Sequence, residues 1–372
     1  MPSTNENMRT QNLRNPKNED GDQLFFVGTY STEGPYVPEA NGRGIISCLL
    51  HTRTGKIDTV SACDAIVNAS YLDRSLNSKR LFSVDDQFDQ PGSVQAFACD
   101  EKGRLQPLAS QGSRGTSTCH LSCDEEGYNV FAVSYLNGVL THHQFDGETF
   151  TGNPDCIHYE GSGPNSNRQQ AAHAHQAAIS PGGRWLCVCD LGSDKIWIHR
   201  IKNGEFLRIE QTVDVPTGYG PRHLVWHPDG AKVYVFCELS AHLLVYRWDE
   251  QSGDMVQSGD LASLPDEFEG APAGAAIRMH PSGRALYVSN RNHNSLTMFS
   301  VDERGGLEFE TWFSTQGKTP RDFAIDSTGQ WLLAANQNSD TIVPFRLDPN
   351  TGGPTGEAGP PYPCGTPACL LF

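Results

Sequence analysis

Residues 173–201 read HAHQAAISPGGRWLCVCDLGSDKIWIHRI, and the pattern of this stretch decides the fold because it recurs along the chain. A short strand is followed by a Pro-x-Gly type turn, an apolar strand, a polar connection and a third strand. Clear copies begin with GPRHLVWHPDG (220–230), GAAIRMHPSGR (274–284) and TPRDFAIDSTG (319–329), and weaker ones begin at Asn68 and Ser117. Short apolar runs bounded by turn residues, with no long amphipathic helical window, predict an all-β repeat protein.

The spacing of the copies indicates the architecture. Six corresponding positions lie 46 to 56 residues apart, at Ser70, Cys119, His175, Arg222, Ala275 and Arg321. This period suits four-stranded propeller blades. The N-terminal copy starts at its second strand, LFFVGTY (24–30), and TPACLLF (366–372) resembles the missing first strand, which places Ala368 in the seventh position. The sequence therefore predicts a seven-bladed β-propeller with a composite first blade. Two separate β-sandwiches would require a central linker, and none is visible.

Composition sets the class of protein. The chain has 372 residues and a formal net charge of −16, which disfavours nucleic acid and anionic membranes as partners. Its apolar runs are far shorter than the roughly 20 residues of a membrane-spanning helix. Residues 1–22 contain almost nothing apolar, so we expect a disordered polar tail without a signal-peptide core, followed by one propeller domain over residues 23–372.

The cysteines are consistent with a reducing compartment. There are 11 of them, an odd number in a long chain, so we expect free thiols in a cytoplasmic protein. Cys187 and Cys189 lie two apart within an apolar strand, where we expect them to be buried as small hydrophobic residues. We expect a monomer or a weak homo-oligomer.

The repeat register predicts a site at one end of the ring. In a blade the start of the first strand lies beside the end of the antiparallel second strand, so both positions open on the same end. The first-strand positions are Ser70, Cys119, His175, Arg222, Ala275, Arg321 and Ala368. The second-strand positions are Tyr30, Asp86, Tyr135, Leu191, Glu238, Arg291 and Gln337. We call this end the mouth end.

The chemistry of these positions indicates an anion site. Three arginines, a histidine and a glutamate gather there in an acidic chain, more than solvent exposure alone would explain. His173, two residues before His175, shares its face. We expect no metal and no cofactor, because the guanidinium groups beside His175, Glu238 and Asp86 would repel a cation.

The motifs HAHQAAISP (173–181), DLGSDKI (190–196), GPRHLVWHP (220–228), TPRDFAID (319–326) and TPACLLF resemble the seven-bladed propeller lactonases. The loop EGSGPNSNRQQAAHAH (160–175) is also similar, and the resemblance runs from about residue 24 to 372. This family is typified by the bacterial 6-phosphogluconolactonase of propeller type and related to the fungal carboxymuconate lactonising enzyme. The sequence departs from the family at Cys237, where Asn is usual.

The resemblance implies site residues and a reaction. The His, two Arg and Glu proposed for the fungal enzyme fall on His175, Arg222, Arg291 and Glu238, which we expect to be catalytic. The repeat register, with His173 beside it, supplies a second set that we expect to contact the substrate, an anionic sugar lactone: Arg321, His173, Asp86, Tyr135 and Gln337. Metal-free hydrolysis of 6-phosphogluconolactone in the pentose phosphate pathway is the implied activity.

Two other functions stay open from the sequence. The same arginines would suit the substrate carboxylates of a carboxymuconate-type lactonising cycloisomerase. A non-catalytic scaffold that binds proteins on its blade faces would leave the mouth residues dispensable.

Overall fold

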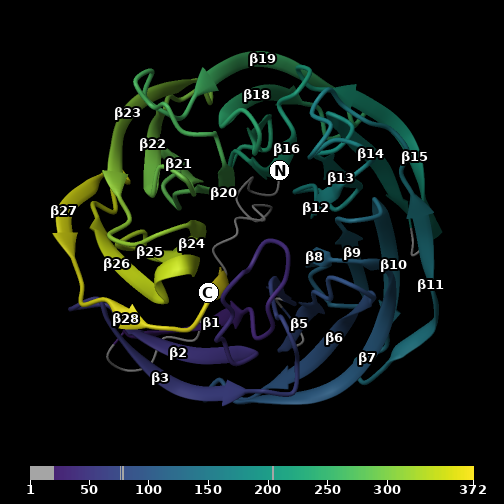
Figure 1. Ribbon diagram of the computed structural model, residues 1–372, viewed down its shortest axis with the longest axis horizontal. Helices are drawn as coiled ribbons and strands as arrows, with labels where there is room; N and C mark the ends of the chain where they lie inside the picture. The colour runs from purple at the N-terminus through teal and green to yellow at the C-terminus, as the bar shows by residue number, and fades with distance from the viewer. Residues whose placement is uncertain (1–20, 76, 78, 203–204) are drawn as a thin grey trace, which may run out of the picture.

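The computed structural model describes residues 21–75, 77, 79–202 and 205–372, with the side chains of 205–207 left aside. Within these residues the strands form seven sheets arranged around a central axis, as Figure 1 shows. The predicted all-β, seven-bladed propeller is confirmed.

Each blade has four principal strands, which follow one another from the axis outward except in the first blade. Blade 1 contains β29 (Pro367–Leu371), β1 (Gln23–Thr29), β2 (Ile45–His51) and β3 (Lys56–Cys63). Blade 2 contains β4 (Leu72–Arg74), β5 (Arg80–Asp85), β6 (Pro91–Cys99) and β7 (Leu105–Thr116). Blade 3 contains β8 (Thr118–Cys123), β9 (Asn129–Ser134), β10 (Val139–Phe145) and β11 (Phe150–His158). Blade 4 contains β12 (Ala174–Ile179), β13 (Trp185–Asp190), β14 (Lys195–Lys202) and β15 (Glu205–Asp214).

The remaining blades repeat the arrangement. Blade 5 contains β16 (Pro221–Trp226), β17 (Lys232–Cys237), β18 (His242–Trp248) and β19 (Met255–Ala262). Blade 6 contains β20 (Gly274–Met279), β21 (Ala285–Asn290), β22 (Ser295–Val301) and β23 (Leu307–Ser314). Blade 7 contains β24 (Pro320–Ile325), β25 (Trp331–Asn336), the short 3-10 helix η1 (Gln337–Ser339), β26 (Thr341–Leu347), β27 (Pro354–Ala358) and β28 (Tyr362–Pro363), which pairs with β26.

The two ends of the chain close the ring, as the sequence predicts. Strand β29 pairs antiparallel with β1, with Leu370 opposite Val27. The Leu370 amide also donates to Asp322 Oδ2 of blade 7 at 2.9 Å, and the Phe372 ring lies 5.3 Å from that of Phe25. This strand therefore joins the first and last blades and covers an edge that would otherwise be unpaired.

The core lies between neighbouring blades. Second strands such as β13 and β25 are buried along their whole length, whereas the outer strand β23 exposes most of its residues. Cys187 and Cys189 are fully buried between blades 4 and 5, as predicted, and all eleven cysteines are free thiols.

One backbone feature repeats in every blade and sets the direction of the mouth side chains. The amide of each second-strand position donates to the carbonyl two residues before the matching first-strand position, at 2.7–3.1 Å. In six blades the inner pairing shifts at this point, leaving one extra residue on the inner strand: Ala368, Cys119, His175, Arg222, Arg321, and one of Ala275 and Ala276. Such β-bulges re-aim side chains and are common beside active sites.

Residues 1–20 of the predicted polar tail lie outside the described residues. Asp22, which we expected in that tail, is instead buried and ion-pairs with His51 at 2.8 Å, so the packed part of the chain includes it. In the described part of the chain, no helix is long and apolar enough to cross a membrane.

Candidate active site

The residues at the mouth end belong to inner strands or follow directly from second strands. His175, Arg222 and Arg321 are the bulge residues of β12, β16 and β24. Asp86, Tyr135, Glu238, Arg291 and Gln337 each come directly after a second strand: β5, β9, β17, β21 and β25. The register predicted from the sequence is therefore the register of the structure.

Glu238 lies at the centre of a buried charge cluster. Its Oε2 atom accepts from Arg222 Nε at 3.0 Å and lies 2.9 Å from Arg291 Nη2. Its Oε1 atom accepts from Arg168 Nη2 at 2.5 Å. The Glu238 amide donates to the Gly220 carbonyl, and Gly220 lies two residues before Arg222. The backbone of blade 5 therefore brings Glu238 and Arg222 together. We call Glu238, Arg168, Arg222 and Arg291 the Glu238 cluster.

The cluster fixes the ionisation of its members. Burial acts to raise the pKa of Glu238, but Arg291, Arg168 and Arg222 outweigh it and hold that pKa well below its usual range. Burial, together with the positive charge of Arg291, lowers the pKa of Arg222 to about 10. Both groups are charged at neutral pH, and the single carboxylate is surrounded by three guanidinium groups.

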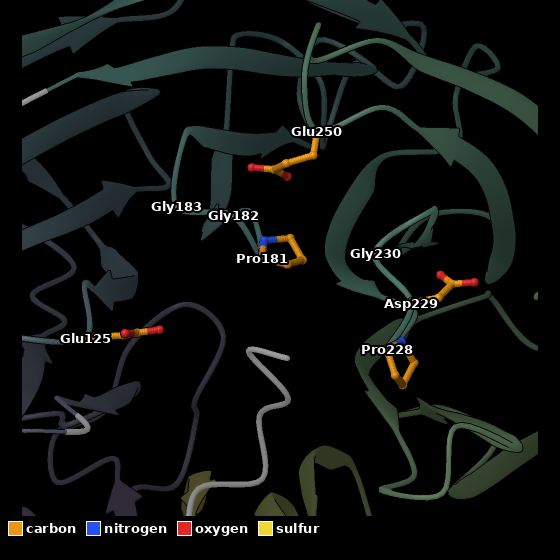
Figure 2. A pocket seen from close by; sticks show the side chains of 8 residues that line it. All are labelled: Glu125, Pro181, Gly182, Gly183, Pro228, Asp229, Gly230 and Glu250. Atoms are coloured by element: carbon orange, nitrogen blue, oxygen red, sulfur yellow. The ribbon is translucent and has the colours of Figure 1, made fainter. Parts of the chain in front are cut away.

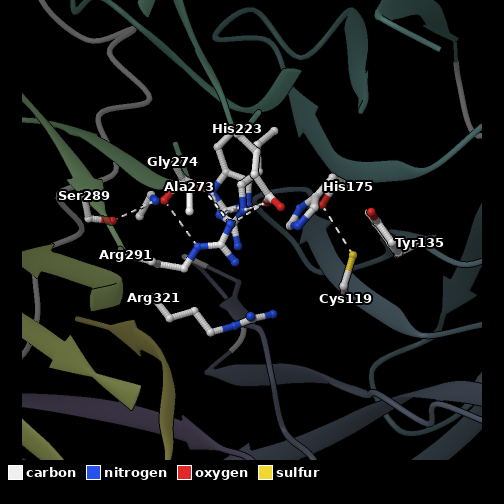
Figure 3. A network of polar contacts seen from close by, with 12 residues as sticks. Cys119, Tyr135, His175, His223, Ala273, Gly274, Ser289, Arg291 and Arg321 are labelled. Atoms are coloured by element: carbon white, nitrogen blue, oxygen red, sulfur yellow. Dashed lines mark hydrogen bonds and ion pairs between the residues drawn. The ribbon is translucent and has the colours of Figure 1, made fainter. Parts of the chain in front are cut away.

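His175 lies beside this cluster and is 6% exposed. Its ring centroid is 5.7 Å from that of Tyr135 and 5.3 Å from that of His223, and its carbonyl faces the Cys119 thiol, as Figure 3 shows. Burial, followed by the charge of Arg222, lowers the pKa of His175 well below 6.5. The imidazole is therefore neutral at neutral pH and can accept a proton.

Arg321 belongs to a second network across the mouth. Its Nη2 atom donates to the Tyr30 hydroxyl at 2.7 Å, and Tyr30 donates to Asp86 Oδ2 at 3.0 Å. Ser117 donates to the other oxygen of Asp86 at 2.8 Å. Asp86 thus reaches Arg321 through Tyr30, and its assignment to substrate binding remains a prediction.

Tyr135 and His173 form an aromatic wall next to His175. Their rings stack at 4.5 Å with an interplanar angle of 12°, and His173 Nδ1 contacts the Tyr135 carbonyl at 2.8 Å. His173 is 1% exposed, so it supports Tyr135 from behind. Gln337 is also buried and donates to Asn338 at 2.9 Å, so its predicted substrate contact also remains a prediction.

Sequence reasoning missed Arg168 as a candidate. It lies in the loop between β11 and β12, outside the repeated blade pattern, so blade alignment gives it no position. The signal was present only in the resemblance of the loop EGSGPNSNRQQAAHAH to the lactonases.

His120 and His223 were also missed. Their ring centroids are 5.5 Å apart, although they come from blades 3 and 5, so both point toward the axis. Arg222 Nη1 is 3.3 Å from both ring nitrogens of His223, which places the guanidinium over the face of the ring and not in its plane. This stacking is favourable while His223 is neutral, and burial lowers the pKa of His223 well below 6.5.

A cavity of about 460 Å³ lies among turns at the end of the ring opposite the mouth end. Figure 2 shows the side chains that line it. It is lined by the turns between first and second strands, including Pro181–Gly183 and Pro228–Gly230, and by three carboxylates: Glu125, Asp229 and Glu250. Negative charge makes this end unsuitable for an anionic ligand.

Across residues 21–75, 77, 79–202 and 205–372, no group of three or more His, Cys, Asp or Glu residues is arranged to hold a metal ion. At the mouth end the carboxylate of Glu238 is already occupied by arginines.

Comparison with known proteins identifies the relatives of this chain. The family model described as "Lactonase, 7-bladed beta-propeller" matches residues 24–372. The 6-phosphogluconolactonase of Bacillus subtilis (strain 168) is 31% identical over 358 residues, which cover 94% of this chain and 98% of that protein. A 6-phosphogluconolactonase of Formosa agariphila is 32% identical over 352 residues, which cover 88% of this chain and 93% of that protein. The solved structure of the periplasmic gluconolactonase of Pseudomonas aeruginosa matches with a TM-score of 0.85 at 28% identity, covering 94% of this chain and 98% of that one.

Proposed function

Because the chain belongs to the seven-bladed β-propeller lactonase family and is a lactonase, a carboxylic-ester hydrolase, we propose that its substrate is 6-phosphogluconolactone. The proposed product is 6-phosphogluconate, and the proposed pathway is the pentose phosphate pathway. Two relatives that align over most of their length carry the corresponding name. The catalytic residues of the proposal are His175, Glu238, Arg222 and Arg291.

The surplus of guanidinium groups at the mouth end is the observation that supports a phosphorylated substrate. Arg168, Arg222 and Arg291 share the single carboxylate of Glu238, and Arg321 bonds a neutral tyrosine hydroxyl. A phosphate dianion would balance this positive charge. Arginine also presents planar, paired donors that match phosphate and carboxylate oxygens.

Opening of the lactone requires a proton acceptor and a stabilised oxyanion. In the proposed step, water attacks the carbonyl carbon while His175 takes its proton, and Arg222 or Arg291 donates to the oxyanion of the tetrahedral intermediate. The intermediate then collapses with cleavage of the ring C–O bond. The ring oxygen receives the proton from His175, so the products are a hydroxyl group and a carboxylic acid that ionises.

The bound anion also assists the base. Positive charge from Arg222 contributes to the low pKa of His175, and a substrate phosphate and a developing oxyanion would offset that charge. Proton uptake by His175 therefore becomes more favourable when an anionic substrate is bound.

A panel of sugar lactones tests the proposal. We expect 6-phosphogluconolactone to be hydrolysed with a higher kcat/KM than glucono-lactone, after subtraction of the spontaneous hydrolysis rate. Equal kcat/KM values for the two lactones would contradict the phosphate requirement. Turnover of a carboxymuconate with no lactone hydrolysis would favour the cycloisomerase instead.

A further inference from the structure

We propose that Arg168 is a substrate-binding arginine that exchanges Glu238 for the anionic group of the substrate when the substrate binds. The inference deepens and rests on the proposed function, because it concerns the anion of the same substrate. It gives a role to a residue of the mouth end that lies outside the strands of the seven blades.

Arg168 makes two contacts with the mouth residues through one nitrogen. Its Nη2 atom donates to Glu238 Oε1 at 2.5 Å and to the Tyr135 hydroxyl at 3.1 Å. Its Nε atom is buried and lacks a hydrogen-bond partner among the residues that the structure describes. A guanidinium with a buried unused donor can gain a hydrogen bond when an anion arrives.

The bond between Arg168 and Glu238 is the one that can be exchanged at least cost. Arg222 and Arg291 both occupy Oε2, so Glu238 keeps two guanidinium partners if Arg168 leaves Oε1. The side chain of Arg168 is also the most accessible of the three, at 32% exposed against 3% for Arg222 and 17% for Arg291. Breaking an ion pair costs less when the group that leaves can be solvated by water, so the partly exposed Arg168 can exchange its partner for a ligand more readily than the buried Arg222.

The loop that carries Arg168 is anchored next to it, so the exchange requires movement of the side chain alone. Gln169 donates from its amide to the Asn165 carbonyl at 2.7 Å, and its side chain donates to the Leu191 carbonyl at 2.9 Å. The Gly163 amide donates to the Gln169 carbonyl at 2.9 Å. These bonds hold the backbone over the mouth end while the long guanidinium arm remains partly exposed.

The exchange has a consequence for Glu238. When the substrate anion holds Arg168, Oε1 of Glu238 is free to accept a hydrogen bond from a substrate hydroxyl. Anion binding and orientation of the sugar ring are then coupled through one side chain.

Calorimetric titration with inorganic phosphate tests the proposal without turnover. We expect Arg168→Gln to weaken phosphate binding about tenfold or more, because a charge-assisted contact is lost, and Arg168→Lys to retain part of the affinity. Asn167→Ala is the matched control, since Asn167 is the exposed neighbour on the same loop. It should bind phosphate as the unaltered protein does.

Kinetics with two lactones separates binding from a structural role. Arg168→Gln should raise KM for 6-phosphogluconolactone about tenfold, while KM for glucono-lactone changes by less than about twofold and kcat is largely kept. Equal damage with both lactones, at an unchanged melting temperature, would show that Arg168 only supports the loop. Unchanged phosphate affinity in Arg168→Gln would overturn the proposal.

The two hypotheses fail in different ways. If the unaltered protein does not hydrolyse 6-phosphogluconolactone faster than glucono-lactone, the proposed substrate is wrong. The phosphate titrations still decide whether Arg168 binds an anion.

Discussion

His175 and Glu238 are neighbours in charge-rich surroundings, yet they are held in different states. Glu238 stays ionised because Arg291, Arg168 and Arg222 outweigh the effect of burial on its pKa. His175 stays neutral because burial and Arg222 lower its pKa. An ionised carboxylate with so low a pKa has no proton to give, so Glu238 does not suit the role of general acid. Its contacts support the role of holding the arginines. The proposed step therefore assigns the proton acceptor to His175, which is neutral, and not to Glu238, which is held by arginines.

Replacing His175 tests this assignment. His175→Ala should lower kcat for lactone hydrolysis by roughly 10²–10⁴-fold with a modest change in KM, because a positioned acid–base group contributes about that much. Steady-state kinetics on a variant with native circular dichroism is the measurement. His242→Ala is the control, since His242 pairs with Asp260 at 2.6 Å on the third strand of blade 5. Near-normal kcat in His175→Ala would remove His175 from the mechanism.

The effect of replacing a mouth arginine on KM should depend on whether that arginine contacts Glu238 or Tyr30. Arg222→Ala and Arg291→Ala each remove a group that contacts Glu238, and at least one should raise KM for a phosphorylated lactone about tenfold or more. That increase should shrink when the lactone lacks phosphate. Arg321→Ala, which loses its bond to Tyr30, should have a smaller effect. If all three variants keep normal KM values, the cluster does not bind the substrate anion.

At the level of strands, sequence reasoning predicted the blades and the positions at the mouth end because both follow from a repeated backbone pattern. It did not predict that His120 and His223 face the axis. An ideal strand alternates its side chains, which would place the residue after each first-strand position on the other face. The β-bulges at Cys119 and Arg222 remove that alternation and turn the next residue inward.

Arg168 escaped prediction for a different reason. Its position depends on how one long connection folds over the ring, and no repeat of the pattern specifies that path. Non-local contacts such as those of Gln169 with Leu191 hold the loop.

The closing strand makes a prediction at the element scale. Deleting residues 366–372 removes β29, and with it the buried side chains of Leu370 and Phe372, each worth roughly 1.5–3 kcal/mol. It also removes the Thr366 carbonyl that accepts from the Tyr30 amide and the Leu370 amide that donates to Asp322. We expect a large fall in the free energy of unfolding, measured by chemical denaturation.

Deletion of residues 1–20 is the matched control for that experiment. This segment is nearly devoid of apolar side chains, so its removal should leave the free energy of unfolding almost unchanged. Equal tolerance of both deletions would contradict the role of β29 as a closing strand.

Considered as a whole, the molecule separates its charges. The chain carries a net charge of −16, and the cavity at the end opposite the mouth end is lined by Glu125, Asp229 and Glu250. The mouth end gathers Arg168, Arg222, Arg291 and Arg321 around few carboxylates. An anionic substrate is therefore repelled at one end of the ring and attracted at the other, and we expect the association rate at the mouth end to fall as ionic strength rises.

The buried histidines along the axis make stability depend on pH. Burial, assisted by nearby arginines, lowers the pKa of His120, His175 and His223 well below 6.5 in the folded protein. Because the unfolded chain binds these protons near pH 6.5 and the folded chain does not, stability is lost as pH falls below that value, at up to about 1.4 kcal/mol per pH unit for each histidine. The low pKa of Glu238 acts in the same direction only below its unfolded value of about 4.5, so Glu238 does not add to the loss of stability between pH 6.5 and 5.

Chemical denaturation between pH 7.5 and 5 measures this dependence, and His120→Asn isolates one histidine. The ring centroids of His120 and Tyr71 lie 3.8 Å apart, and neither ring nitrogen of His120 has a hydrogen-bond partner among the described residues, so its replacement should leave a folded protein. In the variant, the slope of the free energy of unfolding against pH should decrease by the contribution of about one proton, whatever its stability at pH 7.5. An unchanged slope would mean that His120 takes up its proton in the folded state. Burial and the nearby arginines would then not keep this histidine neutral.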